Sequence, residues 1–192
     1  KMKKILIIAF ALQFTACGIQ SIPQAKNETE AKVAEINNQY KRRADLIPNL
    51  VKVVKSYAEH EKETLEAVVN ARAKASSMNL NADNLNAKNL QAFNKAQSQL
   101  SGALSRLLVT VERYPELKSN QNFRDLQAQL EGSENRIAVA RNRYIESVKQ
   151  FNNLVTVPPT SWTNSLVYKF DKMPQWEDPN EEQNKQAPEI DL

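Results

Sequence analysis

The stretch that decides the fold is residues 41–74, KRRADLIPNLVKVVKSYAEHEKETLEAVVNARAK. Apolar residues recur in it at alternating steps of three and four positions, and the pattern continues on both sides. The full series is Val33, Ile36, Tyr40, Arg43, Ile47, Leu50, Val54, Tyr57, Glu61, Thr64, Val68, Ala71 and Ala75. Such a narrow stripe is typical of a helix that packs against other helices. We therefore predict one long helix over residues 28–76, with Pro48 producing a kink near Ala44.

Two further stripes predict two more long helices, over residues 86–114 and 120–155, separated from the first by an asparagine-rich connection. The second stripe is Leu90, Phe93, Gln97, Leu100, Leu104, Leu107, Val111 and Tyr114, and the third is Phe123, Leu126, Leu130, Ser133, Ile137, Ala140, Tyr144, Ser147, Phe151 and Leu154. Prolines follow both stripes and end the helices. We expect an all-α antiparallel bundle of three long helices with coiled-coil-like packing. A short fourth helix over residues 160–170 should cap one end with Trp162, Leu166, Val167 and Phe170.

The expected helix lengths are unequal. At 1.5 Å per residue the first helix is about 73 Å long, the second about 44 Å and the third about 54 Å. The second helix can then cover the first only from about Ile47 onward, which leaves residues 28–46 as a projecting stalk. Because Val33, Ile36 and Tyr40 lie on this stalk and need cover, we expect either a returning C-terminal segment, or a protein partner or self-association through residues 28–46.

The N-terminus reads KMKKILIIAFALQFTACG and resembles an export signal. Basic residues precede an apolar run over residues 5–14 that is too short to span a bilayer comfortably. The sequence Phe14-Thr15-Ala16-Cys17 resembles a lipobox, which predicts lipidation of Cys17 and an anchored body facing the periplasm or extracytoplasmic side of the cell membrane or outer membrane. The alternatives are an uncleaved anchor running to Ile22 and a free, buried cysteine. Residues 18–27 would be a tether.

Composition bounds the rest of the chain. The 192 residues contain only three glycines, which argues against a turn-rich β-fold or a glycine-lined phosphate loop. The net charge is +4, but residues 171–192 carry seven acids against two lysines and form an acidic tail that we predict to be disordered. Residues 28–170 then form the bundle. No basic stripe with interleaved aromatic residues occurs, so we expect no nucleic-acid partner.

The sequence offers no recognisable reactive centre. His60-Glu61 begins like a zinc-protease motif, but the position one turn later is Thr64 instead of a second histidine. His60 is the only histidine in the chain, which excludes a paired Glu-x-x-His di-iron site and histidine-based triads. We therefore predict no catalytic residues, no metal site and no cofactor.

Polar residues on the stripes are the remaining candidates for a site. One interpretation is structural: Arg43 extends its charged end to solvent and Glu61 finds a cationic or hydroxyl partner. The other is a polar network inside the bundle, formed by Arg43, Glu61, Arg136 and Arg141, in which Glu61 joins one of the two arginines of the third helix.

Three blocks resemble the LemA family of bacterial membrane-associated proteins: residues 42–74, residues 108–123 (LVTVERYPELKSNQNF) and residues 126–144 (LQAQLEGSENRIAVARNRY). The resemblance covers about residues 34–151. It implies an α-helical antiparallel bundle on an N-terminal membrane anchor. Members of the family have no agreed catalytic residues, so none is transferred. Many have a spanning segment where this chain has Cys17.

These observations predict a membrane-anchored helical scaffold or interaction protein of the cell envelope, without enzymatic activity. The alternative is a sensor or ligand-binding module that uses the bundle core, for which a pocket lined by Tyr57, Arg136 and Tyr144 would be favourable. An enzyme is the third interpretation, but the available carboxylates and basic groups have a spacing that indicates no reaction.

Overall fold

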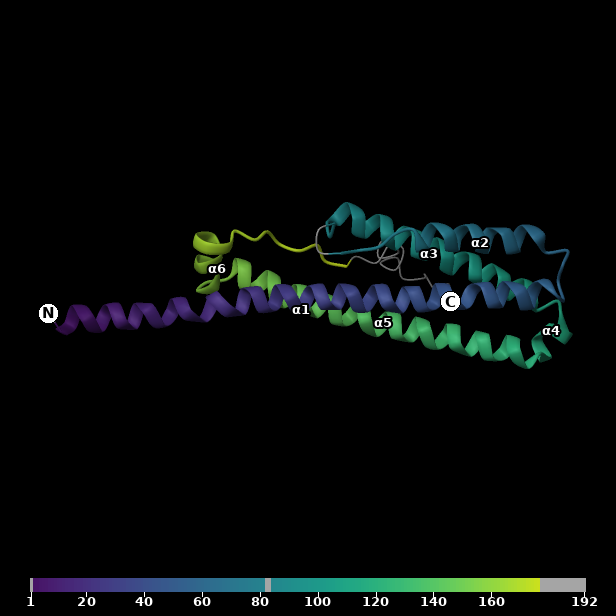
Figure 1. Ribbon diagram of the computed structural model, residues 1–192, viewed down its shortest axis with the longest axis horizontal. Coiled ribbons are helices and arrows are strands. Elements are labelled where there is room, and N and C mark those ends of the chain that lie inside the picture. Colours follow the sequence, from purple (N-terminus) through teal and green to yellow (C-terminus); the bar gives the residue numbers. More distant parts are fainter. Residues whose placement is uncertain (1, 82–83, 177–192) are drawn as a thin grey trace, which may run out of the picture.

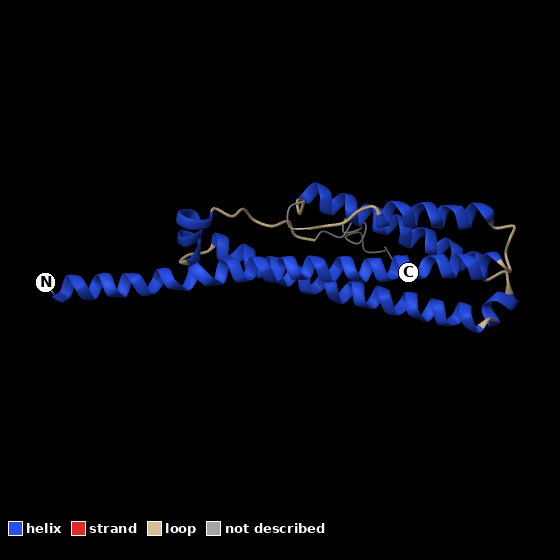
Figure 2. Ribbon diagram, in the orientation of Figure 1, coloured by secondary structure: helices blue, strands red, loops and turns tan. Residues whose placement is uncertain are grey.

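The computed structural model describes the backbone of residues 2–81 and 84–176, and the side chains from residue 19 onward within those ranges. This part of the chain is helical, with no strand (Figure 2). The elements are α1 (Met2–Lys55), α2 (Lys62–Ser76), α3 (Ala87–Val111), α4 (Pro115–Ser119), α5 (Gln121–Thr156), α6 (Thr160–Thr163) and the π-helix η1 (Asn164–Tyr168). The predicted all-α class is confirmed. No helix within the described ranges is long and apolar enough to cross a bilayer.

Four long helices, α1, α2, α3 and α5, run in alternating directions along the chain (Figure 1). The prediction of one first helix over residues 28–76 is wrong, because the chain turns back between Lys55 and Lys62 and continues antiparallel as α2. No glycine or proline lies in this connection. The turn places Ala58, which is 1% exposed, in the core and leaves the predicted core residue Tyr57 41% exposed.

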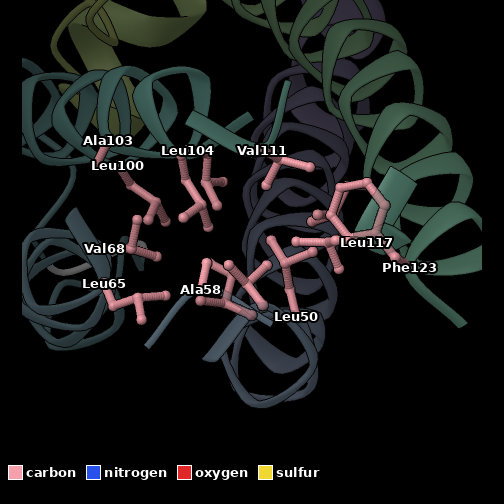
Figure 3. Packing of buried hydrophobic residues seen from close by; sticks show 14 of the residues in the cluster. Leu50, Ala58, Leu65, Val68, Leu100, Ala103, Leu104, Val111, Leu117 and Phe123 are labelled. Carbon is pink, nitrogen blue, oxygen red and sulfur yellow. The ribbon is translucent and has the colours of Figure 1, made fainter. Parts of the chain in front are cut away.

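Packing of α2 against α3 explains why the chain reverses. Leu65 and Val68 on α2 face Leu100 and Leu104 on α3 (Figure 3). Fully burying a leucine or valine contributes about 1.5–3 kcal/mol each, and α2 as a straight continuation of α1 would lose these neighbours. The remainder of this cluster lies around Leu50, Leu117 and Phe123, at the end of the bundle that holds the α1–α2 connection and α4. We call this the turn end.

The predicted stalk, residues 28–46, is instead covered along its length, chiefly by α5. Val33, Ile36 and Tyr40 are at most 3% exposed and lie in one cluster with Phe93 of α3 and Tyr144 of α5. A returning C-terminal segment also contributes, as one of the two alternatives proposed, because Met173 and Trp176 pack against this cluster. Self-association stays a prediction, but these three side chains are already buried within the chain.

Residues 171–176 belong to the ordered body, which corrects their assignment to a disordered tail. Asn152 on α5 holds this segment by donating from Nδ2 to the Met173 carbonyl at 3.0 Å and accepting from the Met173 amide at 2.8 Å. The Tyr144 hydroxyl donates to the Pro174 carbonyl at 2.8 Å. Residues 177–192, the rest of the predicted tail, lie outside the described residues.

The predicted tether, residues 18–27, is also helical, since α1 runs through it. Ile22 is completely buried and packs with Phe151 and Val155 near the end of α5. The packed body therefore begins at about Ile22. The start predicted for the first helix, residue 28, lies inside α1 and begins no helix. Asn86 and Asn120 do cap helices, accepting from the amides of Asn89 and Phe123.

Two prolines, Pro23 and Pro48, lie inside α1 without ending it. A proline has no amide hydrogen, so each one leaves the carbonyl four residues earlier without its helical donor. For Pro48 that carbonyl is Ala44, and it accepts from Arg72 Nε of α2 at 2.8 Å. For Pro23 it is Ile19, and it accepts from the Tyr168 hydroxyl of η1 at 2.6 Å. A neighbouring helix therefore replaces each missing hydrogen bond.

The short fourth helix exists, as α6 followed by η1, but its predicted orientation is wrong. Trp162, Leu166 and Val167 are 63%, 80% and 59% exposed, and Thr163 and Asn164 face the bundle instead. Only Phe170 packs inward as expected, on Phe151 with ring centroids 6.3 Å apart. We call this end of the bundle, formed by α6, η1 and the part of α1 around Ile19, the cap end.

Candidate functional site

The most unusual side chain in the core is Arg43 on α1, which is 1% exposed. Its Nη2 donates to Gln97 Oε1 at 2.6 Å, and its Nη1 donates to Ser101 Oγ at 2.9 Å and to the Glu134 carboxylate. Gln97 in turn donates from Nε2 to the Ala75 carbonyl at 3.4 Å. The Arg43 guanidinium therefore connects α1 with α3 and α5, and Gln97 extends the network to α2.

The prediction that Arg43 extends its charged end to solvent is wrong, because the side chain is 1% exposed. A guanidinium presents five N–H donors in a fixed plane, and three of them are directed here at side-chain oxygens of two helices. Arg43 Nε has no hydrogen-bond partner among the described residues. The Glu134 side chain is 46% exposed, so solvent screens the ion pair from its carboxylate side. The hydrogen bonds to Gln97 and Ser101 therefore offset much of the free-energy cost of burying this charge.

A second cluster adjoins the first and centres on Tyr40, which is 3% exposed. Arg141 Nε donates to the Tyr40 hydroxyl at 2.9 Å, and the Arg141 guanidinium lies 5.2 Å from the centroid of the Trp176 ring. The Arg43 guanidinium lies 5.1 Å from the Tyr40 ring. Burial raises the pKa of Tyr40, although the positive charge of Arg141 acts in the opposite direction. Tyr40 therefore stays a neutral phenol well above neutral pH.

These two clusters line a groove of about 650 Å³ between α3 and α5. Its α3 wall consists of small and polar residues that include Ser98, Ser101, Gly102 and Ser105. Its α5 wall carries Glu134 and Arg141, and Trp176 of the returning segment also lines it. Hydroxyls, one carboxylate and one guanidinium can bind a polar ligand or an extended peptide through hydrogen bonds. This size is within the usual range for ligand sites, about 300–1,000 Å³.

The predicted link from Glu61 to Arg136 or Arg141 does not form, so the predicted polar network is wrong, although two of its residues meet at Tyr40. Arg43 and Arg141 both contact Tyr40, from different helices. Glu61 belongs to neither cluster, because it lies at the turn end and accepts from Arg113 Nη2 and from the Tyr114 hydroxyl, both at 2.9 Å. The hydrogen bond to Glu61 raises the pKa of Tyr114. Arg136 is exposed on α5 and does not reach Glu61. The cationic and hydroxyl partners expected in the structural interpretation of Glu61 are both present.

Sequence reasoning missed the acid that pairs with Arg43. Glu134 lies one position beyond the stripe residue Ser133, so the periodicity gave no signal for it. Gln97 did give a signal, because it was a polar residue on the second stripe just as Arg43 was on the first. Pairing those two would have located the site on α1 and α3.

The pocket suggested for a ligand-binding module, lined by Tyr57, Arg136 and Tyr144, does not form. None of the three lines the groove between α3 and α5. The Tyr57 hydroxyl accepts from Asn120 Nδ2 at 3.0 Å at the turn end. Tyr144 is 1% exposed beneath the returning segment, where burial raises its pKa.

His60 lies exposed in the connection between α1 and α2. Within the part of the chain that the structure describes, no three His, Cys, Asp or Glu side chains come close enough together to hold a metal ion.

These features define a class: helical-bundle proteins with a buried polar centre and a lateral groove. The family model of the LemA family matches residues 32–192, which is most of the chain. The chain therefore belongs to the LemA family. No curated protein gives a significant match to the chain.

Proposed function

We propose that the protein is a membrane-anchored helical scaffold or interaction protein of the bacterial cell envelope that acts without a catalytic site. The observation that carries this proposal is the short spacing between Cys17 and the packed body. Ile22, five residues after Cys17, is already completely buried on α5. At 1.5 Å per residue this spacing is about 7 Å along α1. A lipid on Cys17 would hold the bundle directly at the membrane surface.

The same spacing favours a lipid anchor over an uncleaved anchor that runs to Ile22. Ile22 packs against Phe151 and Val155, so this side chain is used by the bundle and is not available to lipid. Cleavage before Cys17 would remove residues 1–16 and leave the body intact. We infer that the mature body lies on the extracytoplasmic side, where lipoproteins are processed.

The test is the Cys17→Ser variant, compared with the wild type by membrane fractionation and by mass spectrometry of the N-terminal peptide. We expect a lipid mass on Cys17 in the wild type and release of the variant from membranes. Phe14→Leu is the matched control, since it restores the residue usual at that position and should keep both the lipid and the membrane fraction. A Cys17→Ser chain that stays with membranes, together with an unmodified Cys17 in the wild type, would contradict the lipid anchor.

Partners should be sought in the native membrane by cross-linking followed by mass spectrometry, because that experiment reports compartment and partner together. Size-exclusion chromatography with light scattering then tests self-association. A scaffold is expected to give reproducible cross-links from its exposed face. Cross-links confined to the chain itself would contradict an interaction role.

The groove between α3 and α5 supports a second candidate, a sensor or ligand-binding module. Gly102 offers a clean test, because a Cβ built there has no atom within 4 Å. Gly102→Leu should therefore place an apolar side chain in the groove from a position where its Cβ meets no other atom, and it replaces a helical glycine, which favours helix stability. We expect small molecules that co-purify with the wild type to be absent from Gly102→Leu. Val109→Leu, at an exposed position on the same helix, is the control.

A further inference from the structure

Half of the large apolar side chains that are exposed in the described part of the chain gather at the cap end. There are ten such residues, and five of them are Ile19, Val157, Trp162, Leu166 and Val167, with exposed fractions from 48% to 80%. We call these five residues the cap patch. Single exposed apolar residues are ordinary, but a cluster of this kind marks a surface that contacts something apolar.

The structure fixes this orientation through Asn164. Asn164 Nδ2 donates to the carbonyls of Phe170 at 3.0 Å and Val155 at 3.4 Å, and its Oδ1 accepts from the Phe170 amide at 3.0 Å. The bond to Val155 directs Asn164 toward α5, and the two bonds to Phe170 hold that ring on Phe151 of α5. Residues two positions away in a helix point in nearly the opposite direction, since each residue turns by about 100°. Trp162 and Leu166 are the residues two positions before and after Asn164, so they face outward.

The cap patch lies where the N-terminal part of α1 leaves the bundle. The Tyr168 hydroxyl donates to the Ile19 carbonyl at 2.6 Å, which joins η1 to α1 next to the patch. From this point α1 continues beyond the rest of the molecule toward Met2 (Figure 1). The apolar run of residues 5–14 belongs to this projecting part. The patch therefore borders the segment that carries the anchor.

Charge is also segregated at this end. Residues 19–27 and 147–170, which lie at this end, contain none of the 22 acidic residues of the chain. They contain Lys26, Lys149 and Lys169, and of these Lys26 forms an ion pair with Glu30 within α1. Lysines near a membrane are attracted to anionic lipid headgroups, and tryptophan favours the boundary between headgroups and acyl chains. Exposed tryptophan and aliphatic side chains next to lysines, with no acid among them, match what an anionic lipid surface favours.

We propose that the cap patch is a membrane-docking surface, with Trp162, Leu166 and Val167 inserted into the lipid interface beside the anchor. This inference rests on the proposed membrane anchoring and adds a second point of contact to it. Two contacts hold the long axis of the bundle in a defined direction, with the turn end pointing away from the membrane. The groove between α3 and α5 then extends along the outward-projecting bundle.

The chain provides its own reporters, because its only tryptophans are Trp162 in the patch and Trp176 beside the groove. The full chain is reconstituted into vesicles of phosphatidylethanolamine and phosphatidylglycerol with brominated acyl chains, which quench tryptophan at the interface. Trp176→Phe leaves Trp162 as the reporter, and Trp162→Phe leaves Trp176 as the matched control. Flotation of the vesicles is measured first.

Flotation with quenching of Trp162 and none of Trp176 supports the proposal. Flotation without quenching of Trp162 overturns the docking surface and leaves the anchor intact. A chain that does not float overturns the proposed anchoring and the docking surface with it. A patch buried between two copies, seen as a dimer by light scattering together with an unquenched Trp162, also overturns docking.

A second measurement uses residues 17–192 with Cys17→Ser, which lack both the lipid and the apolar run of residues 5–14, so that their binding to vesicles depends on the patch. Leu166→Asp should lower their partition onto the same vesicles at least about tenfold, since inserting a leucine contributes more than 1.4 kcal/mol. Val109→Asp, at a position 72% exposed on α3, is the control and should leave partition unchanged. Equal partition of the two variants, with unchanged circular dichroism, overturns the proposal.

Discussion

The two ends of the bundle close in opposite ways. At the turn end, Ala58, Leu117 and Phe123 are at most 3% exposed, and Glu61 makes polar contacts with Arg113 and Tyr114 above them. At the cap end, the bundle is sealed by Phe151 and Phe170, but the next layer outward is apolar and exposed. The chain can therefore cover a helical core with polar groups, and it does not do so beside the proposed anchor.

Replacing a leucine at each end should give the largest contrast. Leu117→Ala removes a completely buried side chain and should lower the free energy of unfolding by about 3 kcal/mol. Leu166→Ala should change it by less than about 0.5 kcal/mol, because that side chain is 80% exposed. Urea unfolding followed by far-UV circular dichroism measures both. A large loss at Leu166 would mean that the patch is part of the core.

Ile19 and Ile22, one helical turn apart on α1, mark where the packed body begins. Ile22→Ala should cost about 2 kcal/mol, since Ile22 is completely buried against Phe151 and Val155. Ile19→Ala, one helical turn earlier and 48% exposed, should cost less than half as much. The same urea titration compares them. If Ile22→Ala has no effect, then residues before about 28 act as the tether that the sequence suggested.

The two prolines of α1 give a smaller contrast. Arg72→Ala removes the donor to the Ala44 carbonyl and should lower the free energy of unfolding by about 1–2 kcal/mol. Tyr168→Phe should lower it by less than about 1 kcal/mol, because water can replace the hydroxyl beside half-exposed Ile19. In a Pro48→Ala background the helix regains its own amide donor, so Arg72→Ala should cost markedly less there. Additive effects in this double-mutant cycle would show that Arg72 acts independently of Pro48.

The last prediction concerns the middle of the bundle, where two buried tyrosines should change the free energy of unfolding at alkaline pH and least at neutral pH. Burial raises the pKa of Tyr40 and Tyr144 above the ordinary value of 10.0, so the folded chain keeps two protons that the unfolded chain releases. Stability should therefore be independent of these groups up to about pH 10 and fall above it. Tyr144→Phe should make this alkaline decline less steep. Unfolding curves at a series of pH values test the slope, and an unchanged decline would assign it to other groups.

The sequence correctly indicated where most of the core lies. Val33, Ile36, Tyr40, Arg43, Ile47, Leu50 and Val54 are all buried as the first stripe predicts, and so are Phe93, Leu100 and Leu107 on the second. The helices predicted to start at residues 86 and 120 do start there, with Asn86 and Asn120 as their caps. Periodicity and capping depend on neighbours within one or two helical turns, so a single sequence contains them.

The site could be predicted only halfway. Arg43 and Gln97 were visible as polar residues on apolar stripes, and their hydrogen bond follows once α1 and α3 are placed side by side. The periodicity could not identify Glu134 as the partner of Arg43, because Glu134 lies off the apolar stripe of α5. The link from Glu61 to α5 failed for a related reason: Glu61 lies in a connection that the stripe continued across as if it were helical.

By itself, the sequence determined that this chain is helical and which faces of its helices are apolar. It also shows that residues 1–27 and 147–170 contain no acidic residue. The tertiary structure alone decided that the chain reverses after Lys55, and that residues 162 and 166 face outward. It also decided that hydrogen bonds of Arg43 and Gln97 join the four long helices. The reason is physical. A helical stripe states which face must be covered, but which element covers it depends on the total burial of all the helices together.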